Sequence, residues 1–185
     1  MKNTNDEIII KKKQALFLFK NSSFNKAIDL LNQIILEDEE KDSMSFFLLG
    51  TSYLYERNLE MAEKNLKISI EQNKNYYNSN HNLGVTLQLK ENFEEALVSF
   101  KKALELKPKN LGTLNHIAEC HERNKSFEDA KKYYNNVIEI DPNNKIASKG
   151  LARILIKFGF HKQGLDYFQK SAGLIRFSKE GFKII

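Results

Sequence analysis

Small and apolar residues recur along the chain with a period of 34 to 35 residues. The period is carried by two columns of alanine or glycine and by one column of bulky apolar residues. Their members are Ala15, Gly50, Gly84, Ala118 and Ala152; Ala27, Ala62, Ala96, Ala130 and Gly164; and Leu31, Leu66, Phe100, Tyr134 and Phe168. Self-similarity at this length is typical of stacked helical hairpins, in which each unit buries its apolar face against its neighbours. The pattern therefore predicts five such units.

The spacing of apolar residues within each unit predicts two helices joined by a short turn. Pro108 and Pro142 fall at the same phase, where they end the second helices. Asn92 and Ser126 precede acidic residues, so we expect their side chains to cap the helices that follow. Gly84 is expected where the two helices of its unit approach most closely. The ten expected helices cover about residues 7–20, 24–37, 43–56, 59–72, 77–90, 93–106, 111–124, 127–140, 145–158 and 161–173.

Two segments of the chain resemble the tetratricopeptide repeat (TPR): HNLGVTLQLKENFEEALVSFKKALELKPKN (81–110) and HIAECHERNKSFEDAKKYYNNVIEIDPNN (116–144). The resemblance implies an all-α, right-handed superhelical solenoid of about five helix-turn-helix repeats with a C-terminal capping segment. The expected divisions are an N-terminal tail at 1–7, a TPR array at 8–177 and a capping tail at 178–185. Within the array the repeats cover about 8–42, 43–76, 77–110, 111–144 and 145–177.

The segment after Ser171 reads AGLIRFSKEGFKII and contains six apolar residues. Two interpretations of this segment stand. It folds back over the last helix as a cap, or it begins a further part of a longer protein, since arrays resembling this one often precede an enzyme domain such as a transferase or oxygenase.

Charge is distributed unevenly along the chain, whose net charge is +5. From residue 145 to residue 185 there are nine basic and two acidic residues, whereas the preceding residues contain 20 basic and 22 acidic ones. The C-terminal end is therefore expected to attract anionic groups.

The single cysteine, Cys120, has no partner in the chain for an internal disulfide, which favours a reducing compartment. The amino-terminal sequence MKNTNDEIIIKKK lacks the pattern of a signal peptide, and no apolar run approaches the ~20 residues of a membrane-spanning helix. We therefore expect a cytoplasmic protein that is not inserted in a membrane.

The TPR resemblance implies that the first helix of each repeat lines the concave face of the superhelix. Residues expected to point outward from these helices are apolar or aromatic in the first two repeats, amide-bearing in the middle and cationic in the fifth. A peptide-binding groove is therefore predicted. Its candidate residues are Phe47, Tyr55, Asn78, His81, Asn82, Asn115, Lys149 and Arg153.

Asparagine suits the binding of an extended peptide because its side chain can donate to a main-chain carbonyl and accept from a main-chain N–H. Asn82, in the phrase HNLG, resembles the asparagine ladder in the repeat array of O-linked N-acetylglucosamine transferases. The alternative for Asn82 and Asn115 is a solvated position on a helix. Lys149, Arg153 and Lys157 form a stripe at helical spacing that either pairs with carboxylates or phosphates or remains a solvated face.

The sequence carries no pattern that predicts catalysis or a cofactor. His116 and Cys120 stand one helical turn apart, but a metal site needs more ligands than these two. No nucleophile motif, phosphate-binding glycine loop or distinct pair of catalytic carboxylates is present. We predict neither enzyme activity, nor a cofactor, nor a metal site.

The expected function is a protein–protein interaction scaffold that binds an extended peptide, or a partner segment with an acidic end, in the concave groove. The alternative is a substrate-presenting or regulatory module of a transferase or oxygenase encoded in the same or a neighbouring gene. Nucleic-acid binding is disfavoured because the chain contains four arginines and no base-reading pattern.

Overall fold

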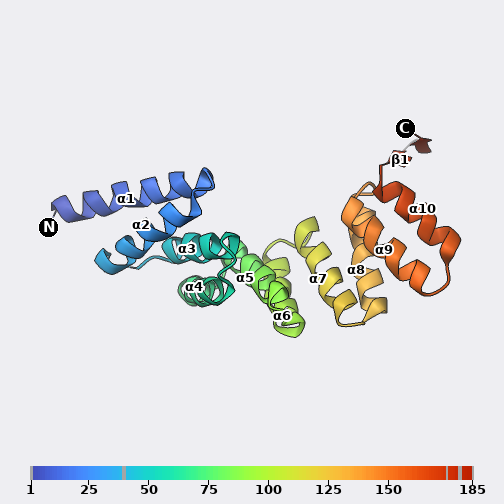
Figure 1. Ribbon diagram of the computed structural model, residues 1–185, viewed down its shortest axis with the longest axis horizontal. Coiled ribbons are helices and arrows are strands. Elements are labelled where there is room, and N and C mark those ends of the chain that lie inside the picture. The colour runs from blue at the N-terminus through green and yellow to red at the C-terminus, as the bar shows by residue number, and fades with distance from the viewer. Residues whose placement is uncertain (1, 39–40, 174, 179–180, 185) are drawn as a thin grey trace. The chain divides into compact units, whose positions relative to one another are not determined.

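The computed structural model describes residues 2–38, 41–173, 175–178 and 181–184, with side chains for residues 6–38 and 41–173. Within these residues the chain forms ten helices followed by two short strands (Figure 1). The helices are α1 (Lys2–Lys20), α2 (Phe24–Glu37), α3 (Ser43–Tyr55), α4 (Leu59–Gln72), α5 (Tyr77–Leu89), α6 (Phe93–Leu106), α7 (Leu111–Arg123), α8 (Phe127–Ile140), α9 (Lys145–Lys157) and α10 (His161–Ser171). The strands are β1 (Ile175–Ser178) and β2 (Gly181–Ile184).

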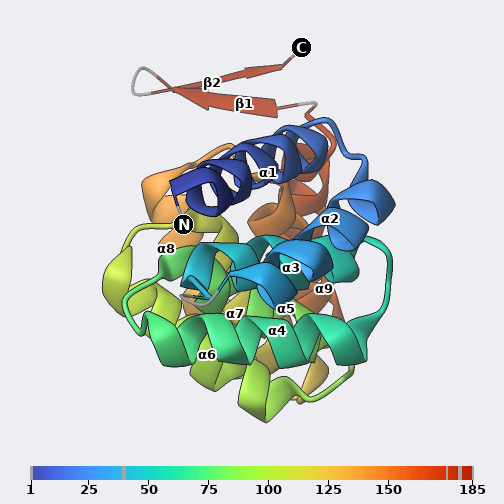
Figure 2. The same ribbon diagram turned by 90° about the vertical axis from the view of Figure 1, so that its left-hand side faces the viewer.

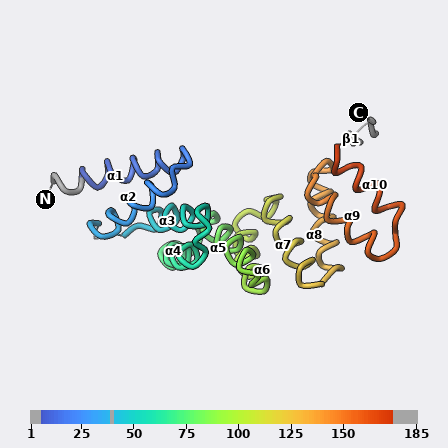
Figure 3. The backbone as a smooth tube through the Cα atoms, viewed as in Figure 1, coloured from blue at the N-terminus to red at the C-terminus, as the bar shows by residue number. Residues whose placement is uncertain are grey.

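Each odd-numbered helix packs against the even-numbered helix that follows it, which confirms the predicted helical hairpins. The backbone trace follows this alternation along the chain (Figure 3). The bounds agree with the sequence prediction to within a few residues, except at the start, where residues 2–7 belong to α1 rather than to a separate tail. The chain divides into two compact units, residues 1–106 and 107–185.

In the first unit, consecutive hairpins stack through α2 against α3 and through α4 against α5. The first helices α1, α3 and α5 also contact one another in sequence, so they form one face of this unit (Figure 2). In the second unit, α8 packs against α9, and the first helices α7 and α9 are in contact. Each unit is thus a stack in which helical hairpins cover one another's apolar sides.

The alanine and glycine residues of the repeating columns lie where the paired helices approach most closely. A Cβ atom added at Gly50 would lie 3.0 Å from the backbone nitrogen of Leu66 and 3.1 Å from the carbonyl oxygen of Ala62. One added at Gly84 would lie 2.6 Å from the ring of Phe100. These distances confirm the close approach that the sequence predicts at Gly84, because a side chain there would occupy space already filled by the second helix.

The turn inside each hairpin uses one residue with left-handed backbone. These residues recur at the repeat period, and only the last of them is glycine: Ser22, Arg57, Glu91, Lys125 and Gly159. The hydrogen bonds around Arg57 are typical: its N–H donates to the carbonyl of Leu54, and the N–H of Asn58 donates to that of Tyr53. This pair of bonds is a Schellman motif, which satisfies carbonyl groups at the end of the first helix.

Side-chain caps occur on second helices as well as first helices: Asn58 caps α4 by accepting a hydrogen bond from the backbone N–H of Met61. Asp42, Asn110 and Asn144 accept hydrogen bonds from the backbone N–H groups three residues later, at the starts of α3, α7 and α9. Ser126 occupies the N-cap position of α8 but makes no side-chain cap hydrogen bond. The cap prediction for Ser126 is therefore wrong.

The chain after α10 forms an antiparallel hairpin that the sequence analysis did not anticipate. Ile175 pairs with Ile184 and Ser178 pairs with Gly181. Strand β1 crosses the expected boundary between the fifth repeat and the tail at residues 177 and 178. The contacts by which residues 178–185 would cap the array lie outside the described side chains.

Candidate functional site

A pocket of about 170 Å³ opens on the first-helix face of the first unit. Helices α1, α2 and α3 build it. Leu31, at the bottom, is fully buried, whereas Leu16 and Met44 are exposed. The lining residues are Lys12, Lys13, Leu16, Leu31, Asp42, Met44, Ser45 and Leu48. The pocket can therefore accept an apolar side chain beside polar groups.

Lys12 joins the three helices that surround this pocket. Its ammonium lies 2.6 Å from Asp38, at the end of α2, and 2.5 Å from Asp42, which caps α3. Burial by itself lowers the pKa of Lys12, but the hydrogen bonds with the two carboxylates outweigh burial and raise it. Burial would likewise raise the pKa of Asp42, yet the bonds from Lys12 and Ser45 hold it below its ordinary value. Lys12 is thus a fixed part of the pocket wall.

The two aromatic candidates from the second repeat differ in their surroundings. Phe47 is buried and meets the ring of Tyr76 edge-on, with 5.0 Å between ring centroids. Tyr55 is exposed and stacks on Phe24 at 4.5 Å. Phe47 therefore belongs to the packed interior of the unit, and Tyr55 remains at its surface.

The three candidates on α5 are all polar. The amide of Asn82 donates a hydrogen bond of 2.9 Å to the hydroxyl of Thr51 on α3. His81 stacks on Tyr77 with 5.6 Å between ring centroids. Asn78 is half-buried, one helical turn before these residues. Asn82 thus links two first helices.

In the second unit, Asn115 connects helices instead of facing solvent. Its side chain is only 4 % exposed, and its amide donates to the Oδ1 atom of Asn144 at 3.2 Å. Asn144 in turn caps α9 by accepting from the N–H of Ala147. The solvated position considered for Asn115 is therefore wrong, because the start of α9 covers the side chain.

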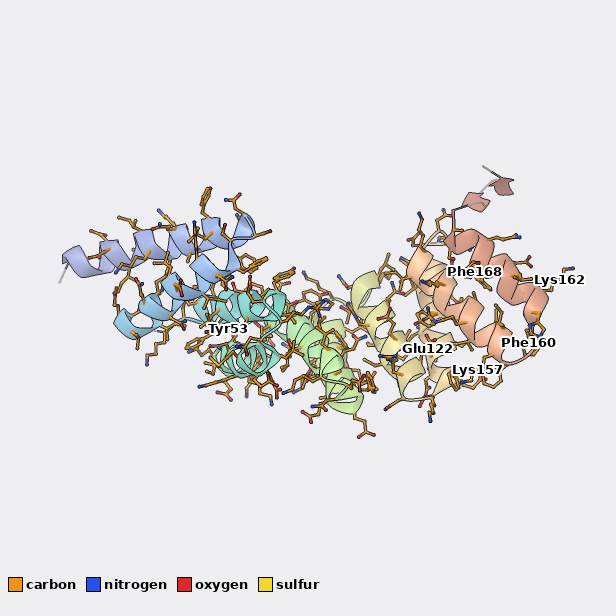
Figure 4. All side chains as sticks on the ribbon, in the orientation of Figure 1. Tyr53, Glu122, Lys157, Phe160, Lys162 and Phe168 are labelled. Carbon is orange, nitrogen blue, oxygen red and sulfur yellow. The ribbon has the colours of Figure 1, made fainter. Side chains whose placement is uncertain are left out.

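Glu122, on α7 (Figure 4), forms a bidentate ion pair with Arg153 of α9. The guanidinium nitrogens Nε and Nη2 lie 2.8 Å and 2.7 Å from the two carboxylate oxygens. The hydroxyl of Tyr134 also donates to Glu122 at 3.0 Å. Burial by itself raises the pKa of Glu122, but Arg153 and Tyr134 outweigh it and lower the pKa. Arg153 is thus held in place by charge-assisted hydrogen bonds.

The other two lysines of the basic stripe differ from Arg153. Lys149 is exposed, and the ammonium of Lys157 lies 4.0 Å from the centre of the Phe127 ring. A cavity of about 370 Å³ lies next to this part of α9. Its lining contains four basic residues and one acidic residue: Glu122, Arg123, Lys125, Phe127, Arg153, Ile154 and Lys157. The cavity is therefore suited to an anionic group.

A third cavity, of about 330 Å³, lies in the first unit near the ends of α4 and α6, and the sequence analysis missed it. It is lined by Ile70, Glu71, Lys74, Asn75, Asn80, Lys102, Glu105 and Leu106. Asn80 is buried there and donates to the carbonyls of Lys74 and Tyr76, so it shapes the loop before α5. No sequence pattern indicates this cavity, because its residues come from segments about 30 residues apart that share no motif.

The residues considered for metal or thiol chemistry are packed or isolated. Burial lowers the pKa of His116, although Glu119 opposes the shift. Burial also raises the pKa of Cys120 to about 12, so its thiol remains protonated at neutral pH. Across the described residues, no group of three or more His, Cys, Asp and Glu side chains could hold a metal ion. None of the described helices is both long and apolar enough to span a bilayer.

Comparison with known proteins adds a family match and several similar structures. A family model described as "Tetratricopeptide repeat" matches residues 87–154. No curated protein sequence matches the chain. A solved structure of MamA, from residue 41 to its end, from Desulfovibrio magneticus RS-1 is 13% identical to this chain. The two align with a TM-score of 0.84 over 91% of this chain and 95% of that one.

Two further solved structures give the same result. A structure described as MamA protein is 16% identical, with a TM-score of 0.82 over 94% of this chain and 92% of that one. MamA AMB-1 is 18% identical, with a TM-score of 0.79 over 92% of each chain. At such low identity these likenesses show the fold, an all-α solenoid of helical hairpins. The family match adds that residues 87–154 are similar to the tetratricopeptide repeat.

Proposed function

We propose that this protein is a non-catalytic interaction scaffold whose first-helix surfaces bind an extended, acidic peptide segment. The repeat fold supports an interaction scaffold. The observation that carries the finer proposal is the apolar pocket between α1 and α3, which places exposed Leu16 and Met44 around a buried floor. We also propose a cytoplasmic location, in keeping with the unpaired thiol of Cys120.

In the first unit, binding would be driven by burial of an apolar side chain of the peptide. A Leu- or Phe-sized side chain gains about 1.5–3 kcal/mol when it leaves water for such a pocket. Lys12 is already neutralised by Asp38 and Asp42, so it supplies its alkyl chain as a wall without a free charge. Asn78 and His81 on α5 would contact the peptide backbone beside this anchor.

In the second unit, Lys149 and the cavity beside α9 would contact acidic groups of the ligand. Arg153 is oriented by Glu122, so little side-chain freedom is lost when a further carboxylate approaches. Because Glu122 already neutralises Arg153, most of the attraction for an acidic ligand would come from Lys149 and Lys157. The similar structures and the family match do not favour the alternative, a module of a transferase or oxygenase.

The proposal is tested by selecting peptides from a random library on the immobilised protein and measuring their affinity by fluorescence anisotropy. We expect the selected peptides to share a bulky apolar residue and to carry acidic residues. Met44→Glu should weaken their binding at least about tenfold, since it places a charge in the apolar pocket. The control Val98→Glu, on the exposed side of α6, should leave affinity unchanged. Equal affinity of the Met44→Glu variant would exclude this pocket as the binding site.

The role of charge is tested with the same peptides and the double variant Lys149→Ala with Lys157→Ala. Binding of the wild-type protein should weaken as salt is raised, because exposed charges are screened. The double variant should bind less tightly at low salt and show a flatter salt dependence. An unchanged salt dependence would assign the attraction to other residues and leave Lys149 and Lys157 as a solvated face.

A further inference from the structure

The first helix of each later repeat carries a stripe of residues that packs against the second helix of the repeat before it. On α5 this stripe contains Ser79, whose hydroxyl lies 2.7 Å from that of Ser69 on α4. The stripe ends at Lys90, directly after α5. The ammonium of Lys90 lies 2.7 Å from Glu63 on α4. Thr86 lies between the two contacts and is fully buried.

The repeat period transfers this stripe to α1, which no repeat precedes within the described residues. The column of Ser79 contains Ser45 and Ala147, and that of Thr86 contains Ser52 and Ile154; all of them are buried. The members of these two columns on α1 are Ile10 and Phe17. Their side chains are 64 % and 66 % exposed. Helix α1 therefore exposes two large apolar residues in positions that are buried between repeats.

Helix α10, the second helix of the fifth repeat, shows the opposite half of the same interface. The bulky column of Phe168 contains Leu31, Leu66 and Tyr134, all fully buried. Tyr134 packs against Gly150 of the next repeat. Phe168 on α10 is 50 % exposed, and Leu165, one turn earlier, is 55 % exposed (Figure 4). Within the described residues no first helix follows α10 to cover Phe168, as one covers its counterparts on α2, α4 and α8.

The two ends are complementary because each presents the half of the interface that the other lacks. A terminal repeat that faces water is expected to carry polar residues on its outer side. Here the outer sides carry Ile10 and Phe17 at one end and Leu165 and Phe168 at the other. If α1 of a second copy packed on α10 as α3 packs on α2, the repeat period would place Ile10 near Ser171 and Lys13, the counterpart of Leu48, beside the Phe168 ring. Phe17 would then lie beside Leu165 and Phe168.

We propose that the protein associates head to tail, with α1 of one copy packed on α10 of another, so that the repeat stack continues from copy to copy. Such a contact is heterologous: the two surfaces that meet are different, and each copy retains one free surface of each kind. Association is therefore expected to extend beyond dimers as the concentration rises. The occupant of both apolar faces is a second copy of this chain.

The experiment measures self-association by sedimentation velocity over a concentration range of about 1 µM to 1 mM. The wild-type protein should show species larger than a monomer that grow with concentration. Phe17→Asp and Phe168→Asp should each reduce association at least about tenfold, because either change places a carboxylate in the apolar contact. Leu36→Asp, on the exposed side of α2, is the matched control and should associate like the wild type. Thermal unfolding of each variant verifies that the fold is retained.

A mixture of the two variants gives the decisive result. Phe17→Asp retains an intact α10 face, and Phe168→Asp retains an intact α1 face. An equimolar mixture should therefore form a dimer containing one copy of each, although neither variant associates alone. If either variant alone associated as strongly as the wild type, the proposal would be overturned. A symmetric contact or another surface would then explain the association. A wild-type protein that stays monomeric throughout would overturn it as well and leave the end faces to a different partner.

Discussion

At the scale of single residues, the turns within the hairpins place unusual demands on the backbone. Five turn residues adopt left-handed conformations, and four of them have side chains: Ser22, Arg57, Glu91 and Lys125. A left-handed conformation costs a residue with a Cβ atom about 1–2 kcal/mol. Only Gly159 avoids this cost. The turns are thus kept in shape by their helices, because the Schellman hydrogen bonds and the packing of both helices outweigh the local strain.

The difference between Gly159 and the four turn residues with side chains can be tested by two opposite substitutions. Lys125→Gly should raise the free energy of unfolding by about 0.5–1 kcal/mol, since relief of the left-handed strain exceeds the added freedom of the unfolded chain. Gly159→Ala should lower it by a similar amount, because an added Cβ at Gly159 meets no atom within 4 Å and only the backbone conformation is affected. Urea denaturation measures both changes. If both substitutions had the same sign, backbone strain would not be the cause.

At the scale of elements, the close pairing of helices depends on small residues at the crossing points. Gly50 and Gly84 meet side chains of the second helix at distances that leave no room for a Cβ atom. The alanines of the same column, Ala15, Ala118 and Ala152, are fully buried. A small side chain thus permits the two helices of a hairpin to pack at short distance, and the bulky column fills the space around it.

Gly84→Val should therefore destabilise the third repeat. The new side chain would collide with the ring of Phe100, and overpacking of this kind typically costs about 1–3 kcal/mol. A lower melting temperature, followed by circular dichroism, would show the effect. Lys101→Val, at an exposed position on α6, is the control for the lower helix propensity of valine and should cost only a few tenths of a kcal/mol. Equal melting temperatures for the two variants would contradict the close approach.

At the scale of the whole molecule, acidic residues link helices of neighbouring repeats at three places. Asp42 binds Lys12 of the first repeat, Glu63 binds Lys90 of the third, and Glu122 binds Arg153 of the fifth. The pKa of each of these carboxyl groups is lowered in the folded protein. For Glu63 the main cause is its hydrogen bond with Lys67, with Lys90 next. Stacking of the repeats is therefore strengthened by ionised carboxylates.

The lowered pKa values predict loss of stability in acid. A carboxyl group with a lower pKa in the folded state binds more protons when the chain unfolds, so stability falls as pH drops below the unfolded value of about 4 and through the lower folded value. Urea denaturation from pH 7 to pH 2.5 measures this dependence. The double variant Glu63→Gln with Glu122→Gln should be less stable at pH 7 and lose less stability on acidification. If the double variant lost as much stability on acidification as the wild type, carboxylates other than Glu63 and Glu122 would be the cause of the acid sensitivity.

The repeat period by itself determined the number, order and bounds of the helices. The small columns also predicted where paired helices approach closely, because close packing at a crossing point constrains residue size directly. The strands of the terminal hairpin were missed, although Ile175 and Phe177, and likewise Phe182 and Ile184, alternate with other residues as strand residues do. The segment was interpreted instead as a cap folded over the last helix or as the beginning of a further part of a longer protein.

The candidate site was less predictable than the fold, because the accessibility of a polar side chain depends on neighbours from other repeats. Asn78 and Asn115 look equivalent in the sequence, yet Asn78 is half-buried whereas the start of α9 covers Asn115. Likewise, the stripe of Lys149 and Arg153 gives no sign that Glu122 neutralises only the arginine. The sequence determined the helices because each is specified by residues within its own repeat. Only the tertiary structure decided which side chains remain available to a ligand, because packing of one repeat on the next buries some side chains and leaves others exposed.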